Sequence, residues 1–383
     1  MLFNFQTVRK VVHGVGAIEK LGNEVRALKG SRVFIVTDKG LAQSPVPAVV
    51  EKALLDAEIP VHIFSDVEPD PTPATVEKST ESAKNFQADI IVGVGGGSSL
   101  DVAKATALLC KHPGPLEQYF GMNLVPSACL PLILIPTTAG TGSEVTSISV
   151  LGDSATNSKK GIVSEELYAK CVFLDPNLTL SLPPHVTAAT GLDAFTHAME
   201  SFVNLLATPL TDALNLQAMK MISSSIRKAY TNGSDIEART QMLYAATIAG
   251  IGFSNTQNGI IHALALAVPT KYHLPHGLLT AALAPMGITF NAISAPEKYA
   301  CIAQILGSSR PEMNLTEQAK SAVDGFRSLL QDLNIKEGLA AYGVERSDLP
   351  QIAEQAVAAK RLMDGNPRKG NVKDILQLLE DNF

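Results

Sequence analysis

The sequence is poor in features that mark secreted and disulfide-stabilised proteins. It has four cysteines in 383 residues, and no two of them form a C-x-x-C pair. Neither a disulfide framework nor a zinc ribbon is therefore indicated, and free thiols fit a reducing, cytoplasmic compartment. The first residues carry no charged segment followed by an apolar stretch of secretory length, so no signal peptide is predicted.

Long apolar runs and basic clusters are missing as well. The apolar segment Cys129–Pro136 is far too short to span a bilayer and contains two prolines. Lysine and arginine total 31 against 37 acidic residues, which gives a formal net charge of -6 and no Lys/Arg-rich run. The composition predicts a globular protein with neither a membrane nor a nucleic acid as partner, long enough for two domains.

The first half of the chain alternates short β-rich runs with helical patterns. The predicted strands are 32–37, 61–65, 88–94 and 132–135, and the predicted helices are 49–57, 73–85 and 100–109. Such alternation indicates βαβ units with a parallel sheet, and the nearly continuous apolar strands indicate burial on both faces.

The pattern changes after about Pro184. The remainder is rich in alanine and leucine and has helical periodicity without repeated strands, which predicts a second, all-helical domain. The predicted helices there are 192–207, 212–230, 235–250, 257–266, 296–306, 317–333 and 348–362. We therefore place the domain boundary between residues 183 and 184.

A glycine-rich turn follows the predicted strand 88–94. It consists of Gly95, Gly96, Gly97 and Ser98. Glycines let backbone N–H groups approach an anion, a helix N-terminus adds positive potential, and a serine can donate one more hydrogen bond. Asp101 falls in the first predicted helical turn, where it could face a ribose or a nicotinamide. The run departs from the usual dinucleotide fingerprint, so a simple tight turn is the alternative interpretation.

Two further segments follow predicted strands. Asp38 ends strand 32–37, at the carboxyl end where open α/β sheets bind ligands. A carboxylate there can accept a hydrogen bond from an adenosine ribose and would repel a 2′-phosphate; a cap or turn aspartate is the alternative. A loop of glycine and small hydroxyl residues after strand 132–135 suits a diphosphate, a plain Ser/Thr loop being the alternative. Its candidate residues are Thr137, Thr138, Thr141, Ser143 and Thr146.

A carboxylate and three imidazoles form a candidate metal site. Asp193 and His197 are spaced i, i+4 in a helical pattern, so both project from one face. His262 lies in another helical segment, and His276 sits in a Pro-His-Gly sequence. Such a set suits a divalent first-row metal, Fe²⁺ or Zn²⁺. Taken separately, Asp193 and His197 also fit a helix cap or a salt bridge, and His276 also fits a loop histidine. Only the joint pattern indicates a metal.

Together these motifs resemble the iron-containing (group III) alcohol dehydrogenase family. The most specific matches are GGGSSLD at 95–101, PTTAGTGSEVT at 136–146, TGLDAFTHAME at 190–200 and PHG at 275–277. The resemblance covers nearly the whole chain. It implies an α/β dinucleotide-binding domain with a parallel sheet at 1–183 and an all-α metal and substrate domain at 184–383, in the dehydroquinate synthase-like architecture.

The resemblance also implies roles and an activity. Asp193, His197, His262 and His276 correspond to the metal ligands of the family. The glycine turn and the loop 137–146 correspond to its cofactor contacts, Lys160 to a lysine that reaches the cofactor, and Asp38 to an acidic position that favours NAD. The implied reaction interconverts a small primary alcohol and its aldehyde by metal-assisted hydride transfer, and the implied assembly is a homodimer or higher homo-oligomer.

One position departs from the family pattern. Many relatives have a second histidine four residues after His262, where this chain has Leu266. Leucine can neither relay a proton nor hydrogen-bond an alcohol. His273 is the candidate substitute, with a solvent-facing loop histidine as the alternative.

The sequence leaves the substrate open. A reductase of a small anionic or hydroxylated aldehyde, similar to lactaldehyde, is one alternative. A non-redox metal lyase of the dehydroquinate-synthase type is another, although such enzymes normally have a glutamate among their ligands. Metal-free maleylacetate reductases share the fold but would not require the four-ligand set, and a non-catalytic protein retaining the fold is the remaining alternative.

Overall fold

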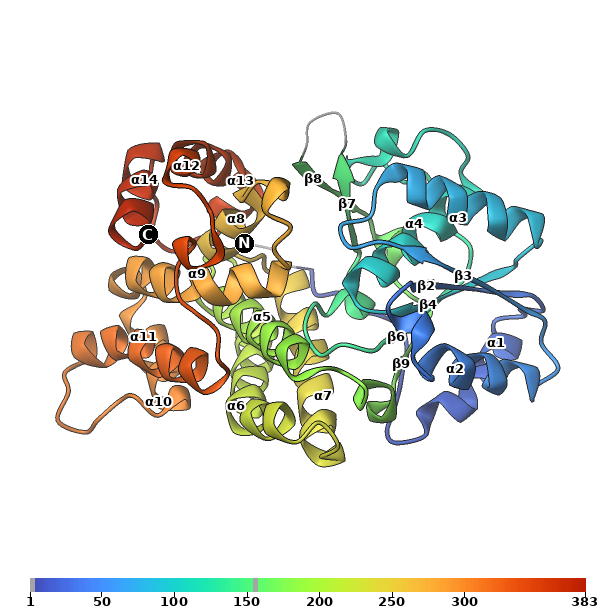
Figure 1. The fold of residues 1–383 in the computed structure, drawn as a ribbon, viewed down its shortest axis with the longest axis horizontal. Coiled ribbons are helices and arrows are strands. Elements are labelled where there is room, and N and C mark those ends of the chain that lie inside the picture. Colours follow the sequence, from blue (N-terminus) through green and yellow to red (C-terminus); the bar gives the residue numbers. More distant parts are fainter. Residues whose placement is uncertain (1–3, 154–157) are drawn as a thin grey trace. The chain divides into compact units, whose positions relative to one another are not determined.

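The computed structural model describes residues 4–153 and 158–383 and contains two compact units (Figure 1). The first, which we call the α/β unit, spans Phe5–Leu182. The second, the helical unit, includes Pro183–Phe383.

A six-stranded parallel sheet forms the centre of the α/β unit. Its strands, in spatial order, are β1 (Val11–His13), β9 (Cys171–Leu174), β6 (Leu132–Pro136), β4 (Ile90–Gly95), β2 (Val33–Asp38) and β3 (Val61–Val67). Every residue of β4 and β6 is buried, which confirms the predicted doubly covered sheet. Strands β1 and β9 were not predicted, because three or four residues are too few to show a periodic pattern.

Helices cover both faces of this sheet (Figure 1). They are α1 (Leu21–Ala27), α2 (Val46–Leu55), α3 (Pro73–Asn85) and α4 (Gly97–Lys111). Leu21 of α1 and Val50 of α2 join a buried apolar cluster with Ile35 of β2. The neighbouring residue Phe34 points to the opposite face, as the period-two geometry of a strand requires, and stacks there on His62.

Three strands form a second, smaller sheet in the same unit, which the sequence did not predict. They are β5 (Gly121–Met122), β8 (Ser158–Val163) and β7 (Ile148–Asp153). β7 and β8 pair antiparallel. β5 has two residues, and β8 begins with a serine and two lysines, so neither carries the apolar alternation by which a half-buried strand is recognised.

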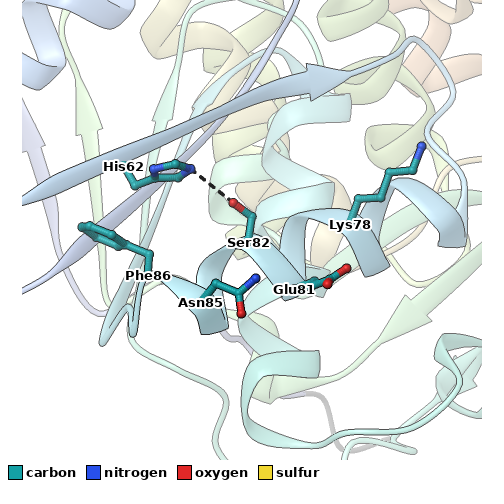
Figure 2. A pocket seen from close by; sticks show the side chains of 6 residues that line it. All are labelled: His62, Lys78, Glu81, Ser82, Asn85 and Phe86. Carbon is teal, nitrogen blue, oxygen red and sulfur yellow. Dashed lines mark hydrogen bonds between the residues drawn. The ribbon is translucent and has the colours of Figure 1, made fainter.

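An open hollow of ≈ 450 Å³ lies beside the edge strand β3 (Figure 2). Six side chains line it: His62, Lys78, Glu81, Ser82, Asn85 and Phe86. The Nε2 atom of His62 lies 3.2 Å from the Ser82 hydroxyl, and its ring centroid is 5.5 Å from those of Phe34 and Phe86. This hollow contains none of the predicted cofactor or metal residues.

The helical unit consists of ten α-helices in the part of the chain that the structure describes. They are α5 (Pro184–Val203), α6 (Pro209–Thr231), α7 (Ile236–Ser254), α8 (Ile260–Ala267), α9 (His276–Asn291), α10 (Pro296–Leu306), α11 (Leu315–Asp332), α12 (Leu349–Ala358), α13 (Lys360–Met363) and α14 (Val372–Asp381). Local signals fix several starts: Thr208 and Asn314 form capping boxes at α6 and α11. The predicted all-helical architecture is confirmed.

Helix α9 corrects the interpretation of His276 as a loop histidine. It begins at His276, directly after Pro275. The sequence did not predict this helix because it is apolar on all sides and lacks a polar stripe. Residues His276–Ser294 are long and apolar enough to cross a membrane, but 72% of their most apolar window is buried inside the protein. They therefore form a core helix.

Helix α4 also differs from its predicted extent. It begins at Gly97, three residues before the predicted start at Leu100. Asp101 therefore lies in the second helical turn and not in the first, since one turn takes 3.6 residues. Asp101 is therefore farther from the helix N-terminus than the sequence predicted.

Candidate metal and cofactor sites

Asp193, His262 and His276 come together from three different helices of the helical unit, α5, α8 and α9. Each offers one ligand atom, and these atoms all lie within 4.8 Å of one another. Asp193 and His262 are buried, and the side chain of His276 is 29% exposed. A mixed carboxylate and imidazole set of this kind suits Fe²⁺ or Zn²⁺.

The fourth predicted ligand, His197, lies beside this group. It is buried one turn after Asp193 on α5, and its Nδ1 atom is 3.9 Å from the Asp193 carboxylate. Its ring stacks on the rings of His262 and Phe253, and the ring centroids are 4.4 Å apart in both pairs. Among the described residues, the converging ligand atoms are those of the other three, so ligation by His197 stays a prediction.

Gly277 allows helices α5 and α9 to approach closely. A Cβ at this position would lie 2.8 Å from the carbonyl oxygen of Ala189 and 3.4 Å from the Cβ of Asp193. One turn further along α9, the Thr280 hydroxyl donates a 2.8 Å hydrogen bond to Asp193 Oδ1. The Pro-His-Gly sequence thus places His276 next to Asp193 because glycine alone fits the crossing.

The charges around the group fit a bound cation. Burial opposes ionisation of Asp193, yet the neighbouring histidines, His197 first, hold its pKa below the ordinary value. Burial would lower the pKa of His262, but the carboxylates of Glu200 and Asp193 raise it to about 9. The Nε2 atom of His262 is buried 3.6 Å from Asp193 Oδ1 and makes no hydrogen bond to any described residue. A metal ion would satisfy this buried nitrogen, so the residues present fit such an ion.

Two residues around the site were missed by sequence reasoning. Glu200 lies on α5, and its Oε2 atom is 2.6 Å from His262 Nδ1. The positions of Asp193, His197 and Glu200, four and then three residues apart, share one helix face, and this spacing could have revealed the glutamate. Asn366 is 1% exposed and accepts a 3.2 Å hydrogen bond from the backbone N–H of Ile260 at the start of α8.

Leu266 and His273 lie outside the ligand group. Leu266 is near the end of α8 and is 38% exposed. His273 is exposed and follows the short 3-10 helix Thr270–Tyr272, with a left-handed backbone at φ 49°. Its predicted role as a proton relay stays a prediction.

In the α/β unit, the structure brings the glycine turn and the threonine-rich loop together at the carboxyl ends of β4 and β6. A Cβ at Gly96 would lie 3.4 Å from the Thr138 side chain, and one at Gly97 would lie 2.9 Å from that of Thr141. The backbone N–H of Thr137 donates a 3.0 Å hydrogen bond to the carbonyl oxygen of Gly95. The glycines therefore make room for the neighbouring loop.

Asp38 lies at the end of the adjacent strand β2. Its Oδ2 atom accepts a 3.1 Å hydrogen bond from the hydroxyl of Ser99, and its Oδ1 atom accepts a 2.8 Å bond from the backbone N–H of Leu41. A Cβ at Gly95 would lie 2.5 Å from the same Ser99 hydroxyl. The bond to Leu41 is the turn-capping contact that the alternative interpretation of Asp38 predicts. The carboxylate is also half-buried and lies beside the glycine turn. Ser98, the second residue of α4, is also half-buried.

A buried lysine holds three of the predicted cofactor residues in place. Lys104 donates to the Ser143 carbonyl and hydroxyl oxygens at 2.7 and 2.8 Å and to the Thr146 hydroxyl at 3.2 Å. Asp101 accepts from the Ser143 hydroxyl at 2.6 Å and from the backbone N–H of Val150 at 2.9 Å. Burial raises the pKa of Asp101 and lowers that of Lys104, while the charge of each partner opposes these shifts.

This network gives Asp101, Ser143 and Thr146 a structural role. Their side-chain polar atoms bond within the protein and fasten the loop to helix α4. Contacts from these residues to a cofactor stay predictions. Lys160 lies on β8, with its Nζ atom 5.8 Å from the centre of the Phe120 ring, and its contact with the cofactor also stays a prediction.

A parallel α/β sheet with ligand-binding strand ends and a carboxylate–imidazole group are the two parts that a metal-dependent dehydrogenase requires. Two family models match the chain: iron-containing alcohol dehydrogenase at residues 8–176, and the C-terminal part of the Fe-containing alcohol dehydrogenase family at residues 187–383. The chain belongs to the iron-containing alcohol dehydrogenase family.

Similar proteins share the full length of the chain. A sulfoacetaldehyde reductase of Bilophila wadsworthia is 52% identical over 385 residues, with 100% of both chains covered. An NAD-dependent methanol dehydrogenase of Bacillus methanolicus is 35% identical, with 99% of both covered. A crystal structure of 1,3-propanediol oxidoreductase has a TM-score of 0.97 at 36% identity, with both chains covered completely. The chain is therefore an oxidoreductase that interconverts alcohols and aldehydes.

Proposed function

We propose that the enzyme reduces a small aldehyde to its primary alcohol with NADH, and that the preferred aldehyde carries an anionic group, as sulfoacetaldehyde does. The observation that carries this proposal is the 52% identity, over the full length, to a protein named sulfoacetaldehyde reductase. The wider family membership supports the alcohol–aldehyde chemistry without choosing a substrate.

We assign cofactor binding to the domain 1–183. The residues proposed to contact the cofactor are Asp38, Gly95, Gly96, Gly97, Ser98, Asp101, Thr137, Thr138, Thr141, Ser143, Thr146 and Lys160. The clustering of the glycine turn, the threonine loop and Asp38 at neighbouring strand ends supports this, since α/β sheets bind nucleotides there. When bound, NADH supplies the hydride. The half-buried Asp38 would repel a 2′-phosphate, which supports a preference for NAD(H) over NADP(H).

We assign metal and substrate binding to the domain 184–383. Asp193, His197, His262 and His276 would hold the metal, Fe²⁺ or Zn²⁺. When bound, a divalent metal supplies a Lewis acid that polarises a carbonyl oxygen.

The protein's own residues have three further tasks. Gly277 and Thr280 hold Asp193 and His276 in register, and burial of Asp193 and His262 excludes water from the ligand atoms. The Leu266 position gives no proton donor. His273 is the proposed relay of the proton to the alcohol oxygen, and its exposure places it in contact with solvent.

A substrate panel tests this function. The purified enzyme would be assayed by NADH oxidation with sulfoacetaldehyde, 3-hydroxypropanal and propanal, each with added Fe²⁺, with Zn²⁺ and after chelation. We expect metal-dependent activity, with the highest kcat/KM for the anionic aldehyde. An equal or higher kcat/KM for propanal would remove the anionic preference, and no NADH oxidation under any condition would refute the reductase function.

We further propose a cytoplasmic homodimer. The four cysteines are all free thiols in the structure, which supports a reducing compartment. The dimer rests on the family resemblance, and light scattering of the purified enzyme measures it directly.

A further inference from the structure

We propose that Glu200 is a positioning residue that fixes the tautomer and the place of His262, so that His262 presents Nε2 to the metal. This inference rests on the proposed metal site. Glu200 itself contributes no ligand atom to the converging group.

The geometry around Glu200 leaves its carboxylate with donors on both oxygens. Oε2 lies 2.6 Å from His262 Nδ1 and accepts a 3.0 Å hydrogen bond from the backbone N–H of Gly259. Oε1 accepts a 2.6 Å bond from the backbone N–H of Ile261. Glu200 is 2% exposed and His262 is 3% exposed, so these groups satisfy one another inside the protein.

These bonds determine which imidazole nitrogen carries the proton. Backbone N–H groups only donate, and an ionised carboxylate only accepts. The contact of 2.6 Å between Glu200 and His262 therefore requires a proton on Nδ1. In the neutral ring, which is the form that binds a metal, Nε2 is then the nitrogen with the lone pair, and it faces the Asp193 carboxylate at 3.6 Å. Metal-bound histidines are commonly oriented by a carboxylate on their other nitrogen in this way.

The same carboxylate also anchors the helix that carries His262. Helix α8 has no side-chain cap from its own N-cap residue, Gly259. Glu200 binds the N–H groups of Gly259 and Ile261, and Asn366 Oδ1 binds that of Ile260 at 3.2 Å. A negative charge at a helix N-terminus is stabilised by the helix dipole.

Position 259 shows how closely these groups pack. A Cβ on Gly259 would lie 2.7 Å from Asn366 Oδ1 and 3.1 Å from Glu200 Oε1. Glycine is therefore needed for Glu200 to reach both the helix start and the imidazole. The Glu200 carboxylate fixes both the backbone and the ring orientation of His262. Loss of this carboxylate should therefore lower the metal affinity more than the loss of a helix cap alone would.

The decisive variant is Glu200→Gln. An amide of the same size can donate from its nitrogen to His262 Nδ1, which would move the imidazole proton to Nε2 and block metal binding. We expect Zn²⁺ affinity, measured by competition with a chromogenic chelator, to fall by about 10–100-fold. The matched control is Asn366→Ala, which removes a cap of α8 without touching His262. It should lower the thermal midpoint of the metal-free protein and leave Zn²⁺ affinity within about threefold of wild type.

Wild-type enzyme provides a measurement that does not depend on the folding of a variant. The ¹⁵N NMR spectrum of the Zn²⁺-loaded protein with labelled histidine should show His262 coordinated through Nε2 and protonated at Nδ1. Coordination through Nδ1, or wild-type Zn²⁺ affinity in folded Glu200→Gln, would overturn the assignment of Glu200. Failure of wild-type enzyme to bind Zn²⁺ or Fe²⁺ would instead refute the proposed metal site itself.

Discussion

The substitution Gly277→Ala tests most directly how the ligand residues are brought together. The added Cβ would lie 2.8 Å from the carbonyl oxygen of Ala189, whereas carbon–oxygen contacts between packed backbones are ordinarily about 3.3–3.6 Å. Helix α9 must therefore move away from α5 by roughly half an ångström or more. His276 is the neighbouring residue on α9, so its imidazole moves with the helix, away from Asp193.

The expected magnitude follows from overpacking at a buried helix crossing. Inserting a methyl group into a filled site destabilises a protein by about 1–3 kcal/mol. For a domain of this size, each kcal/mol lowers the thermal midpoint by about 2–4 °C. We expect Gly277→Ala to lower the midpoint of the metal-free protein by several degrees and to weaken metal binding at the same time.

Two measurements check this prediction. Thermal unfolding of the chelated protein reports the packing, and chelator competition reports the metal affinity. Gly152→Ala is the matched control, because a Cβ there meets its nearest atom at 3.5 Å, an ordinary van der Waals contact. If Gly277→Ala kept both the wild-type midpoint and the wild-type affinity, the close crossing would not be what positions His276.

Three further predictions follow from other contacts. Asp38→Asn should reduce the discrimination against NADP(H) by about tenfold, which corresponds to about 1.4 kcal/mol of lost repulsion; a wild-type kcat/KM for NADPH equal to that for NADH would contradict the role of Asp38. Lys104→Met should destabilise the protein by about 3–5 kcal/mol in urea unfolding, because it leaves the buried Asp101 without its cation, whereas Lys111→Met on the exposed end of α4 should have little effect. Metal affinity should rise with pH up to about 9, because the pKa of His262 is raised to about 9 without metal and its Nε2 proton must leave on binding; an affinity independent of pH between 6 and 9 would show that this proton is not displaced.

The central strands of the α/β unit were predictable because burial on both faces makes them continuously apolar. Strands 32–37, 88–94 and 132–135 correspond to β2, β4 and β6 within one or two residues at each end. The edge strand β1 and the inner strand β9 were missed, since their three or four residues carry too little pattern. Helix α9 was missed for a different reason: it is apolar on all sides, so no polar stripe marks its period.

Residues of the ligand group could be named from the sequence, but the residues that hold functional side chains in place were not named from it. Asp193, His262 and His276 were identified by motif, and the structure brings them together. Glu200 was readable in principle from its spacing on α5. Lys104 was not, because a lysine in a helix normally points to solvent, and only the tertiary packing of the loop 143–148 shows that this one is buried.

The glycines of the β4–α4 turn have a consequence for recognising active members of this fold. At Gly95 and Gly97, the space that a Cβ would take is already filled by the protein's own Ser99 and Thr141. A descendant that had lost its coenzyme would still need these glycines in order to fold. The glycine motif is therefore a marker of architecture, and a genome survey that used it to count working dehydrogenases would overcount. His276, which offers a ligand atom to the metal group and whose side chain is 29% exposed, discriminates better.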